Sequence, residues 1–281
     1  MKKIYSIIIV VILLASLGFS YLAYNKVNGG NTQQDSLSKI QKTKIMKVCY
    51  VVWPPAVIKD SKTGQLSGHD IDAIEMMAKE LGVKIEYHES TFGNMATAVQ
   101  TGQCDLGTSL FVKIPRAALV DFSDPLFYAG NSGLVKKGDT RFKTIEDVDK
   151  PGIKVAVSTG ESGDIYATAH FKNAQITRID VESSDISRFL LEVTSGRADI
   201  GIADANTIRL FAAAHPEATD VFAKNPFDIN PNGWPIRHGD SPLKEFINNS
   251  LLYIQTSGGW DQLEKKYDAH WLHENKTYSI N

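Results

Sequence analysis

The sequence predicts an α/β protein of two lobes, and three observations support this prediction. Its length of 281 residues is about right for two domains of ordinary size. From Lys44 onward, apolar runs alternate with amphipathic segments, a pattern typical of strands and helices around mainly parallel sheets. The same cycle starts again at Thr144, so each half is expected to form a sheet of its own.

The composition excludes several classes of function. A hydrophobic content of 43% and a charged content of 22% are ordinary for a protein with a good core. The net charge of -2, with no basic run beyond the first residues, gives no electrostatic basis for binding nucleic acid. The histidines lack metal-ligand spacing, and no phosphate-binding loop or Gly-x-Ser-x-Gly turn occurs. We therefore expect no metal, no cofactor and no catalytic triad.

Residues 1–24 are an N-terminal targeting segment. Lys2 and Lys3 precede an uncharged apolar run, residues 4–24, and about 20 apolar residues suffice to span a bilayer. A cleavable signal usually has a shorter apolar region with small residues at its end, and this end is bulky. Two alternatives stay open, a cleaved signal and an uncleaved inner-membrane anchor. Both place the folded part in the periplasm or on the cell surface.

The polar, aperiodic residues 25–43 are expected to be a spacer. The first cycle then follows with apolar runs that end at turn residues, and Gly82 and Gly102 are expected to end its two helices. The expected strands are 45–52, 83–88, 104–112 and the extended segment 130–137, and the expected helices are 69–81 and 94–101.

The second cycle repeats this order and returns to the first lobe. Its expected helices are 144–148, 158–171, 184–194 and 205–213, its strands are 154–157, 176–181 and 198–203, residues 221–236 are irregular, and helices 241–257 and 261–272 close the chain. The chain thus crosses between lobes twice, and two crossings make a hinge. The predicted domains are lobe 1 (44–133 plus 235–275), lobe 2 (134–234) and a tail (276–281).

Cys49 and Cys104 each lie at or near the start of a predicted strand in the same lobe. An even number of cysteines in an oxidising compartment permits one disulfide if the two strands are neighbours. Two small buried thiols are an equally good interpretation, because free cysteine packs readily in cores.

Arg116 follows a buried strand after a turn marked by Pro115. A surface arginine would fit this position, but so would a cleft arginine whose forked donors bind a carboxylate. Ligands of open α/β sheets bind beyond the carboxyl ends of the strands, where Asp204 also lies. The residues expected to line the cleft between the lobes are Trp53, Phe92, Ser109 to Arg116, Ser158 to Ser162 and Asp204.

Six short motifs occur in an order and spacing that identify a family. They are TrpProPro at 53–55, GlyHisAspIleAspAlaIle at 68–74, ThrGlyGlnCysAspLeuGly at 101–107, ProArgAlaAlaLeuValAspPheSerAspProLeu at 115–126, SerGlyArgAlaAspIleGlyIleAlaAsp at 195–204 and SerGlyGlyTrp at 257–260. On these motifs, residues 44–272 resemble the bacterial extracellular solute-binding proteins of family 3, the periplasmic amino-acid-binding components of ABC transporters. The resemblance implies a type II periplasmic-binding-protein fold, an amino-acid ligand, a membrane permease as partner and a monomer.

The resemblance also implies roles for four residues. Arg116 matches the arginine that binds the α-carboxylate of the ligand, and Asp204 matches the aspartate that pairs with its α-ammonium. Trp53 and Phe92 match aromatic residues beside the ligand side chain, although ordinary core positions remain an alternative for both. A zwitterion fits one fixed cation and one fixed anion on opposite lobes, because only closure then satisfies both charges.

Two positions depart from the family pattern. Lys113 stands where family members usually have threonine, and Glu161, in the turn with Thr159, replaces a threonine that usually contacts the ligand carboxylate. Glu161 has three possible placements: in the anion site at a helix N-terminus, away from the cleft, or paired with Lys113 across the cleft. If Glu161 lines the pocket, a cationic ligand group is favoured.

A related enzyme, cyclohexadienyl dehydratase, provides an alternative function. Residues 140–153, 215–217 and 226–229 resemble it, but Thr207 occupies the position of its catalytic glutamate. A threonine hydroxyl cannot act as a carboxylic general acid at neutral pH, so we expect a binding protein without catalysis. A membrane-tethered ligand sensor is a third possibility if residues 1–24 stay on the mature protein.

Overall fold

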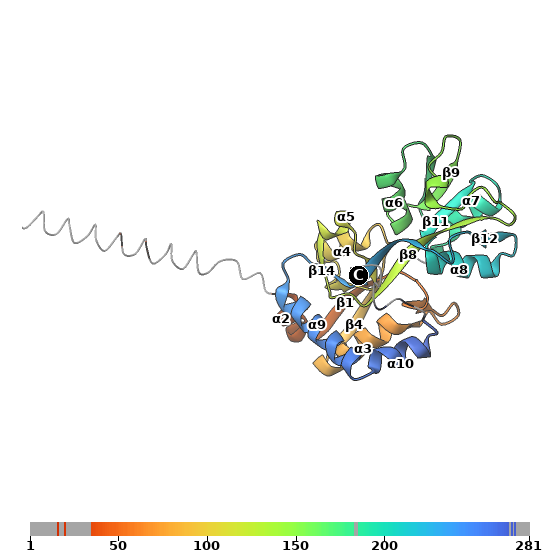
Figure 1. The fold of residues 1–281 in the computed structure, drawn as a ribbon. Helices are drawn as coiled ribbons and strands as arrows, with labels where there is room; N and C mark the ends of the chain where they lie inside the picture. Colours follow the sequence, from red (N-terminus) through yellow and green to blue (C-terminus); the bar gives the residue numbers. More distant parts are fainter. Residues whose placement is uncertain are drawn as a thin grey trace, which may run out of the picture.

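The computed structural model describes residues 35–182 and 185–269, together with the single residues 16, 20, 271 and 273. Most of the expected targeting segment, about half of the expected spacer and the expected tail lie outside these described residues. Figure 1 shows two α/β lobes joined by long strands, which confirms the predicted fold class. In the described part of the chain, no helix combines the length and the apolar character that crossing a membrane requires.

Lobe 1 is built on a five-stranded mixed sheet. Strand β1 runs parallel to β4 on one side and to β5 on the other, while β14 is antiparallel to β5 and β7. The strands, in sheet order, are β4 (Lys84–Glu89), β1 (Ile45–Tyr50), β5 (Leu106–Gly107), β14 (Pro235–Arg237) and β7 (Val120–Phe122), and a small hairpin is formed by β2 (Ile58–Lys59) and β3 (Leu66–Ser67).

Helices cover this sheet because their apolar residues recur at helical spacing. In α3 (His69–Leu81), Ile71, Ile74 and Met77 are buried, and Gly82 ends the helix with a left-handed φ of 62°. These bounds are the predicted ones. Lobe 1 also contains α4 (Met95–Gln100), α9 (Ser241–Thr256) and α10 (Gly259–Lys266).

The end of the expected spacer is a helix, α2 (Ser36–Thr43), so the prediction of a linker is wrong there. Asp35 caps its N-terminus by accepting a hydrogen bond from the Ser38 amide at 2.8 Å. Ile40 is fully buried in the core of lobe 1, and the Ser36 amide donates to Asp240 at 3.1 Å. The sequence did not predict this helix because a single buried apolar position among polar residues gives only a weak periodic signal.

Lobe 2 surrounds a seven-stranded sheet that continues into the hinge. Strand β9 lies between the parallel strands β10 and β11, and β8 is antiparallel to β11, β12 and β13. The strands are β10 (Gln175–Ile179), β9 (Lys154–Ser158), β11 (Ile200–Asp204), β8 (Phe127–Lys136), β13 (Phe227–Gly233), β6 (Leu110–Phe111) and β12 (Ala218–Asp220). Its helices are η1 (Ile145–Asp147), α6 (Ser162–His170), η3 (Arg188–Leu190), α7 (Leu191–Thr194) and α8 (Ala205–Ala214).

Three predictions for the second half are wrong, and one of them is the closing helix, expected at 261–272, because α10 ends at Lys266. The expected helix 184–194 is reduced to a 3-10 turn and one short α-helix, η3 and α7. The segment 221–236, expected to be irregular, contains β13 and the first residues of β14. A bulge between Phe227 and Asn230, with Asp228 at a left-handed φ of 53°, interrupts the alternating pattern that normally marks a strand.

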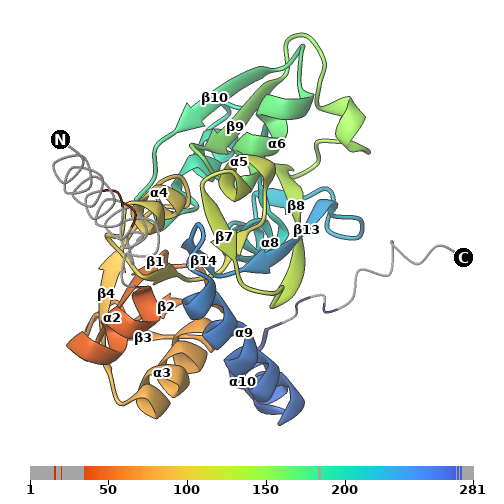
Figure 2. The ribbon, with the colours of Figure 1, turned by 90° about the vertical axis from the view of Figure 1, so that its left-hand side faces the viewer.

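Strands β8 and β13 pair side by side where the two lobes join (Figure 2). The strand expected at 104–112 is split between two sheets, since β5 belongs to lobe 1 and β6 pairs with β13. At the break, the Ser109 amide donates to the carboxylate of Asp70 at 2.6 Å. This bond holds the turn that carries the chain from the lobe 1 sheet to the hinge.

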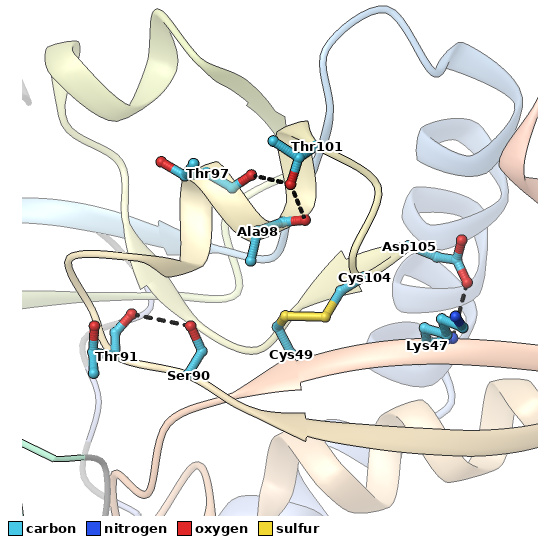
Figure 3. Close-up of a disulfide and its surroundings, with 9 residues drawn as sticks. All are labelled: Lys47, Cys49, Ser90, Thr91, Thr97, Ala98, Thr101, Cys104 and Asp105. Atoms are coloured by element: carbon cyan, nitrogen blue, oxygen red, sulfur yellow. Dashed lines mark hydrogen bonds between the residues drawn. A yellow bond between two sulfur atoms is a disulfide. The ribbon is translucent and has the colours of Figure 1, made fainter.

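Cys49 and Cys104 form a disulfide, with their Cα atoms 5.6 Å apart. Cys49 lies in β1, and Cys104 lies just before its parallel neighbour β5. Figure 3 shows the bridge joining the two segments, and both residues are 1% exposed. The pairing left open by the sequence is therefore present in the structure.

We predict that replacing both cysteines lowers the free energy of unfolding without changing the fold. The bridge closes a loop with a sequence separation of 55 residues, for which chain entropy alone gives about 4 kcal/mol. Urea denaturation of the Cys49→Ala/Cys104→Ala variant should show a loss of roughly 2–4 kcal/mol. Reductant should destabilise the wild type alone, and equal stability of the two proteins would contradict the prediction.

Candidate functional site

Arg116 lies where the two lobes meet, in the short helix α5 (Ile114–Ala117). Its side chain is 5% exposed, and its Nη1 donates to the carbonyl of Phe111 at 3.1 Å. Nη2 donates to the carbonyl of Phe92 at 3.4 Å and to that of Gly160, in lobe 2, at 2.7 Å. Burial lowers the pKa of Arg116 to about 10, so the guanidinium is still charged at neutral pH.

The lobes touch beside this arginine, so the structure is a closed one. A Cβ on Gly160 would lie 2.6 Å from the Cα of Gly93, and Gly160 has a left-handed φ of 73°. A second hydrogen bond between the lobes joins the side-chain amide of Asn206 to the carbonyl of Pro54 at 2.6 Å. Only glycine fits at position 160, where the two lobes approach each other this closely.

Asp204, in lobe 2, ends β11 and caps α8. It is 1% exposed, and its Oδ1 accepts hydrogen bonds from the amides of Asn206 at 3.1 Å and Thr207 at 2.9 Å. Burial raises the pKa of this carboxyl, and the hydrogen bonds from Thr207 and from the Asn206 amide oppose the rise. The position that the sequence predicted for an anion is thus a buried carboxylate.

Glu161 lines the same interface instead of pointing away. It is 6% exposed, and its Oε1 accepts a hydrogen bond from the Asp204 amide at 3.3 Å. Among the described residues, no hydrogen-bond partner reaches its buried Oε2. Burial, reinforced by the charge of Asp204, raises the pKa of Glu161 to about 8, against the lowering effects of the Asp204 amide and Arg116.

Lys113 does not pair with Glu161, although the sequence allowed that placement. It forms an ion pair with Asp228 on β13, and burial lowers its pKa against that pairing. The side chain of Asn131, on β8, also donates to Asp228 at 3.0 Å and accepts a hydrogen bond from Ser162 at 2.6 Å. This polar network holds the side chain of Lys113 within the hinge.

Trp53 and Phe92 form an aromatic wall beside the buried charges. The Trp53 side chain is 2% exposed, and its ring centroid lies 5.9 Å from that of Phe92. The Trp53 ring also lies 6.1 Å from the rings of Phe111 and Phe127. Trp53 belongs to the core of lobe 1, and the partly buried Phe92 packs against that core.

The structure separates the last two predicted site residues. Ser109 is 2% exposed, and no partner for its hydroxyl is found among the described residues. Thr159 has an exposed side chain, and its amide donates to the carbonyl of Ile179 at 3.1 Å. Ser109 is therefore buried close to the interface, whereas Thr159 lies at its rim.

Trp271 supports the aromatic wall, and our sequence reasoning missed it. Its ring stacks on Phe127, with centroids 4.3 Å apart, and lies 5.2 Å from Trp53. Its indole N–H donates to Nε2 of His69 at 2.9 Å. A tryptophan close to a polar tail was the available signal, but it was assigned to a helix that in fact ends at Lys266.

We predict that Trp271→Ala destabilises the protein because it removes the ring behind Trp53. The ring is half-buried, so the expected loss is about 2 kcal/mol, below the 3–5 kcal/mol typical of a fully buried tryptophan. Trp271→Phe keeps the stacking, loses the hydrogen bond to His69 and should retain most of the stability. Urea denaturation measures both effects, and a Trp271→Ala variant as stable as the wild type would refute the supporting role.

Comparison with known proteins points to one family. The family profile of the bacterial extracellular solute-binding proteins, family 3, matches residues 46–270. The glutamine-binding protein GlnH of an ABC transporter in Bacillus subtilis is 28% identical, with 98% of this chain and 99% of the relative covered. Cyclohexadienyl dehydratase of Pseudomonas aeruginosa is 25% identical, with 85% of this chain and 87% of the enzyme covered.

Solved structures agree with these sequence relatives. An ancestral amino-acid-binding protein, a precursor of cyclohexadienyl dehydratase, superposes with a TM-score of 0.72 at 33% identity, over 83% of this chain and 99% of that one. A mutant of the T. maritima protein ArgBP gives a TM-score of 0.73 at 29% identity, over 84% of this chain and 100% of that one.

Proposed function

Because this chain belongs to the bacterial extracellular solute-binding proteins, family 3, we propose that it captures a small amino acid or a similar zwitterion between its two lobes. Relatives named for binding glutamine, histidine and arginine support an amino-acid ligand. The proposal extends to delivery of the ligand to an ABC-transporter permease by a monomeric protein outside the cytoplasm.

The observation that carries the proposal is the placement of opposite charges on opposite lobes. Arg116 comes from lobe 1 and Asp204 from lobe 2, and both are almost fully buried. Arg116 would bind the ligand carboxylate, and Asp204 would pair with the ammonium. In the closed structure, backbone carbonyls accept hydrogen bonds from the guanidinium of Arg116. A carboxylate would replace the cross-lobe carbonyl with a stronger, charge-assisted bond.

Trp53 and Phe92 would cover the ligand side chain, because aromatic rings accept both apolar groups and cations. The hinge strands β8 and β13 would allow the lobes to separate and close again. A ligand that contacts both lobes binds the closed state better than the open one and therefore favours closure.

A thermal-shift screen tests the proposed ligand class. The purified protein is heated with amino acids, polyamines, dicarboxylates and prephenate, since a ligand that binds only the folded state raises the melting temperature. An increase with one or more amino acids is the expected result. Silence across all amino acids would reject the proposed function.

We predict that Arg116→Ala removes most of the affinity for amino acids while the protein stays folded. A hydrogen bond to a charged group contributes about 1.5–3 kcal/mol, so the dissociation constant should rise roughly 10- to 150-fold. Titration calorimetry measures the change, and circular dichroism checks the fold. Arg197→Ala, at a side chain 63% exposed on lobe 2, is the matched control. Unchanged affinity in Arg116→Ala would end the role assigned to this arginine.

The likeness to cyclohexadienyl dehydratase suggests a second candidate function, the dehydratase reaction, which depends on the residue at position 207. Thr207 matches the enzyme's glutamate, lies 6% exposed in the first turn of α8, and hydrogen-bonds Asp204 through its amide. A hydroxyl at this position supplies no acidic proton at neutral pH.

We therefore predict that the unmodified protein does not convert prephenate and that Thr207→Glu gains detectable turnover. The glutamate restores a carboxylic acid at the position of the enzyme's proton donor. The assay follows phenylpyruvate formation by absorbance, with Thr207→Gln as the uncharged control. Turnover by the unmodified protein would favour the enzyme over the binding protein.

A further inference from the structure

Two carboxylates of lobe 2 lie next to each other because of the sheet order. Strands β9 and β11 are parallel neighbours, so their carboxyl ends meet at one edge. Asp204 ends β11, and Glu161 lies three residues after the end of β9. The 3.3 Å hydrogen bond from the Asp204 backbone amide to Glu161 Oε1 holds the Glu161 carboxyl against the main chain of Asp204, whose charge acts on it.

Glu161 has no structural task that uses its second oxygen. Although it is the N-cap residue of α6, its side chain accepts no hydrogen bond from the amides of that helix. Oε2 has no partner in the described part of the chain, and the residue is 6% exposed. A buried carboxyl oxygen without a hydrogen-bond partner is costly, which points to a partner supplied by a ligand.

The charged groups around Glu161 favour a cationic donor. Asp204 faces it from the end of β11, Asp164 from its own helix and Arg116 from α5. Asp164 is paired with Arg178 at 2.8 Å, and Lys113 is held by Asp228. Of these charged groups, Arg116 is therefore the one cation that acts on Glu161. The burial and the charge of Asp204 that raise the pKa of Glu161 to about 8 keep its carboxyl protonated at neutral pH.

On the premise of the proposed function, we propose that Glu161 and Asp204 together bind the ammonium group of the ligand, and that binding releases the proton of Glu161. The ammonium has three N–H donors, and Glu161 Oε2 and the carboxylate of Asp204 would accept two of them. The positive charge favours ionised Glu161. Its O–H bond breaks, the electron pair stays on the carboxylate, and the proton passes to solvent.

This arrangement makes the affinity depend on pH, with a defined sign. Below about pH 8 the ligand has to displace a proton from Glu161, so affinity for an ammonium ligand rises with pH toward that value. Release of one proton corresponds to about a tenfold lower dissociation constant for each pH unit. Above about pH 8 the free site is already ionised, and this dependence ends.

The test is titration calorimetry of the full chain with L-arginine and L-glutamine between pH 6 and pH 8, in buffers of different ionisation enthalpy. For a probe that binds, we expect close to one proton released at pH 7, and a dissociation constant that falls about tenfold between pH 6 and pH 7 and about fivefold between pH 7 and pH 8. Glu161→Gln mimics the protonated carboxyl and should bind with no proton release and no pH dependence. Glu192→Gln, which removes a carboxyl from the surface of lobe 2, should behave as the wild type does.

The outcomes separate the two proposals. Binding without proton release, or a pH dependence that persists in Glu161→Gln, would overturn the role of Glu161 and leave the amino-acid function intact. Failure of both probes to bind, together with silence of all amino acids in the thermal-shift screen, would overturn the function and this inference with it. If Glu161→Gln does not fold, Glu161→Thr replaces it, with the same expected loss of pH dependence.

Discussion

The buried charge of Arg116 is the constraint on which the rest of this site depends. A guanidinium taken out of water has to find acceptors for its donors, because the cost of burying it is otherwise large. The chain supplies carbonyls from both lobes, including Gly160 across the cleft. The same group joins the two lobes in the structure and is the one that we propose as the receptor for the ligand carboxylate. On this proposal, ligand binding and closure share one side chain.

The hinge keeps the second cation of this region away from the cleft. Lys113 is bound by Asp228, whose position depends on the bulge in β13, and Asn131 extends the network to Ser162 at the start of α6. Positive charge at the cleft is therefore concentrated on Arg116, while Glu161 and Asp204 face it from lobe 2. This balance of one cation and two carboxyl groups suits a ligand that carries an amine.

Several features were predictable because they depend on local chemistry. The bounds of α3 follow from its apolar spacing and from the glycine at its end, and Asp204 was placed at a strand end by its position after an apolar run. Contacts between segments distant in sequence were not predictable. The break at Ser109 is set by a bond to Asp70, and Trp271 acquires its role only by stacking on Phe127.

The sequence by itself determined the two-lobed fold and the family, because periodic patterns and motifs record which side chains face a core or the end of a strand. Only the tertiary structure decided how the charges of the cleft are shared. Lys113 pairs with the hinge and Glu161 lies beside Asp204, although the sequence allowed the two to pair with each other. The physical reason is that the charge state and the partner of a buried group depend on its whole surroundings, which several distant segments build together.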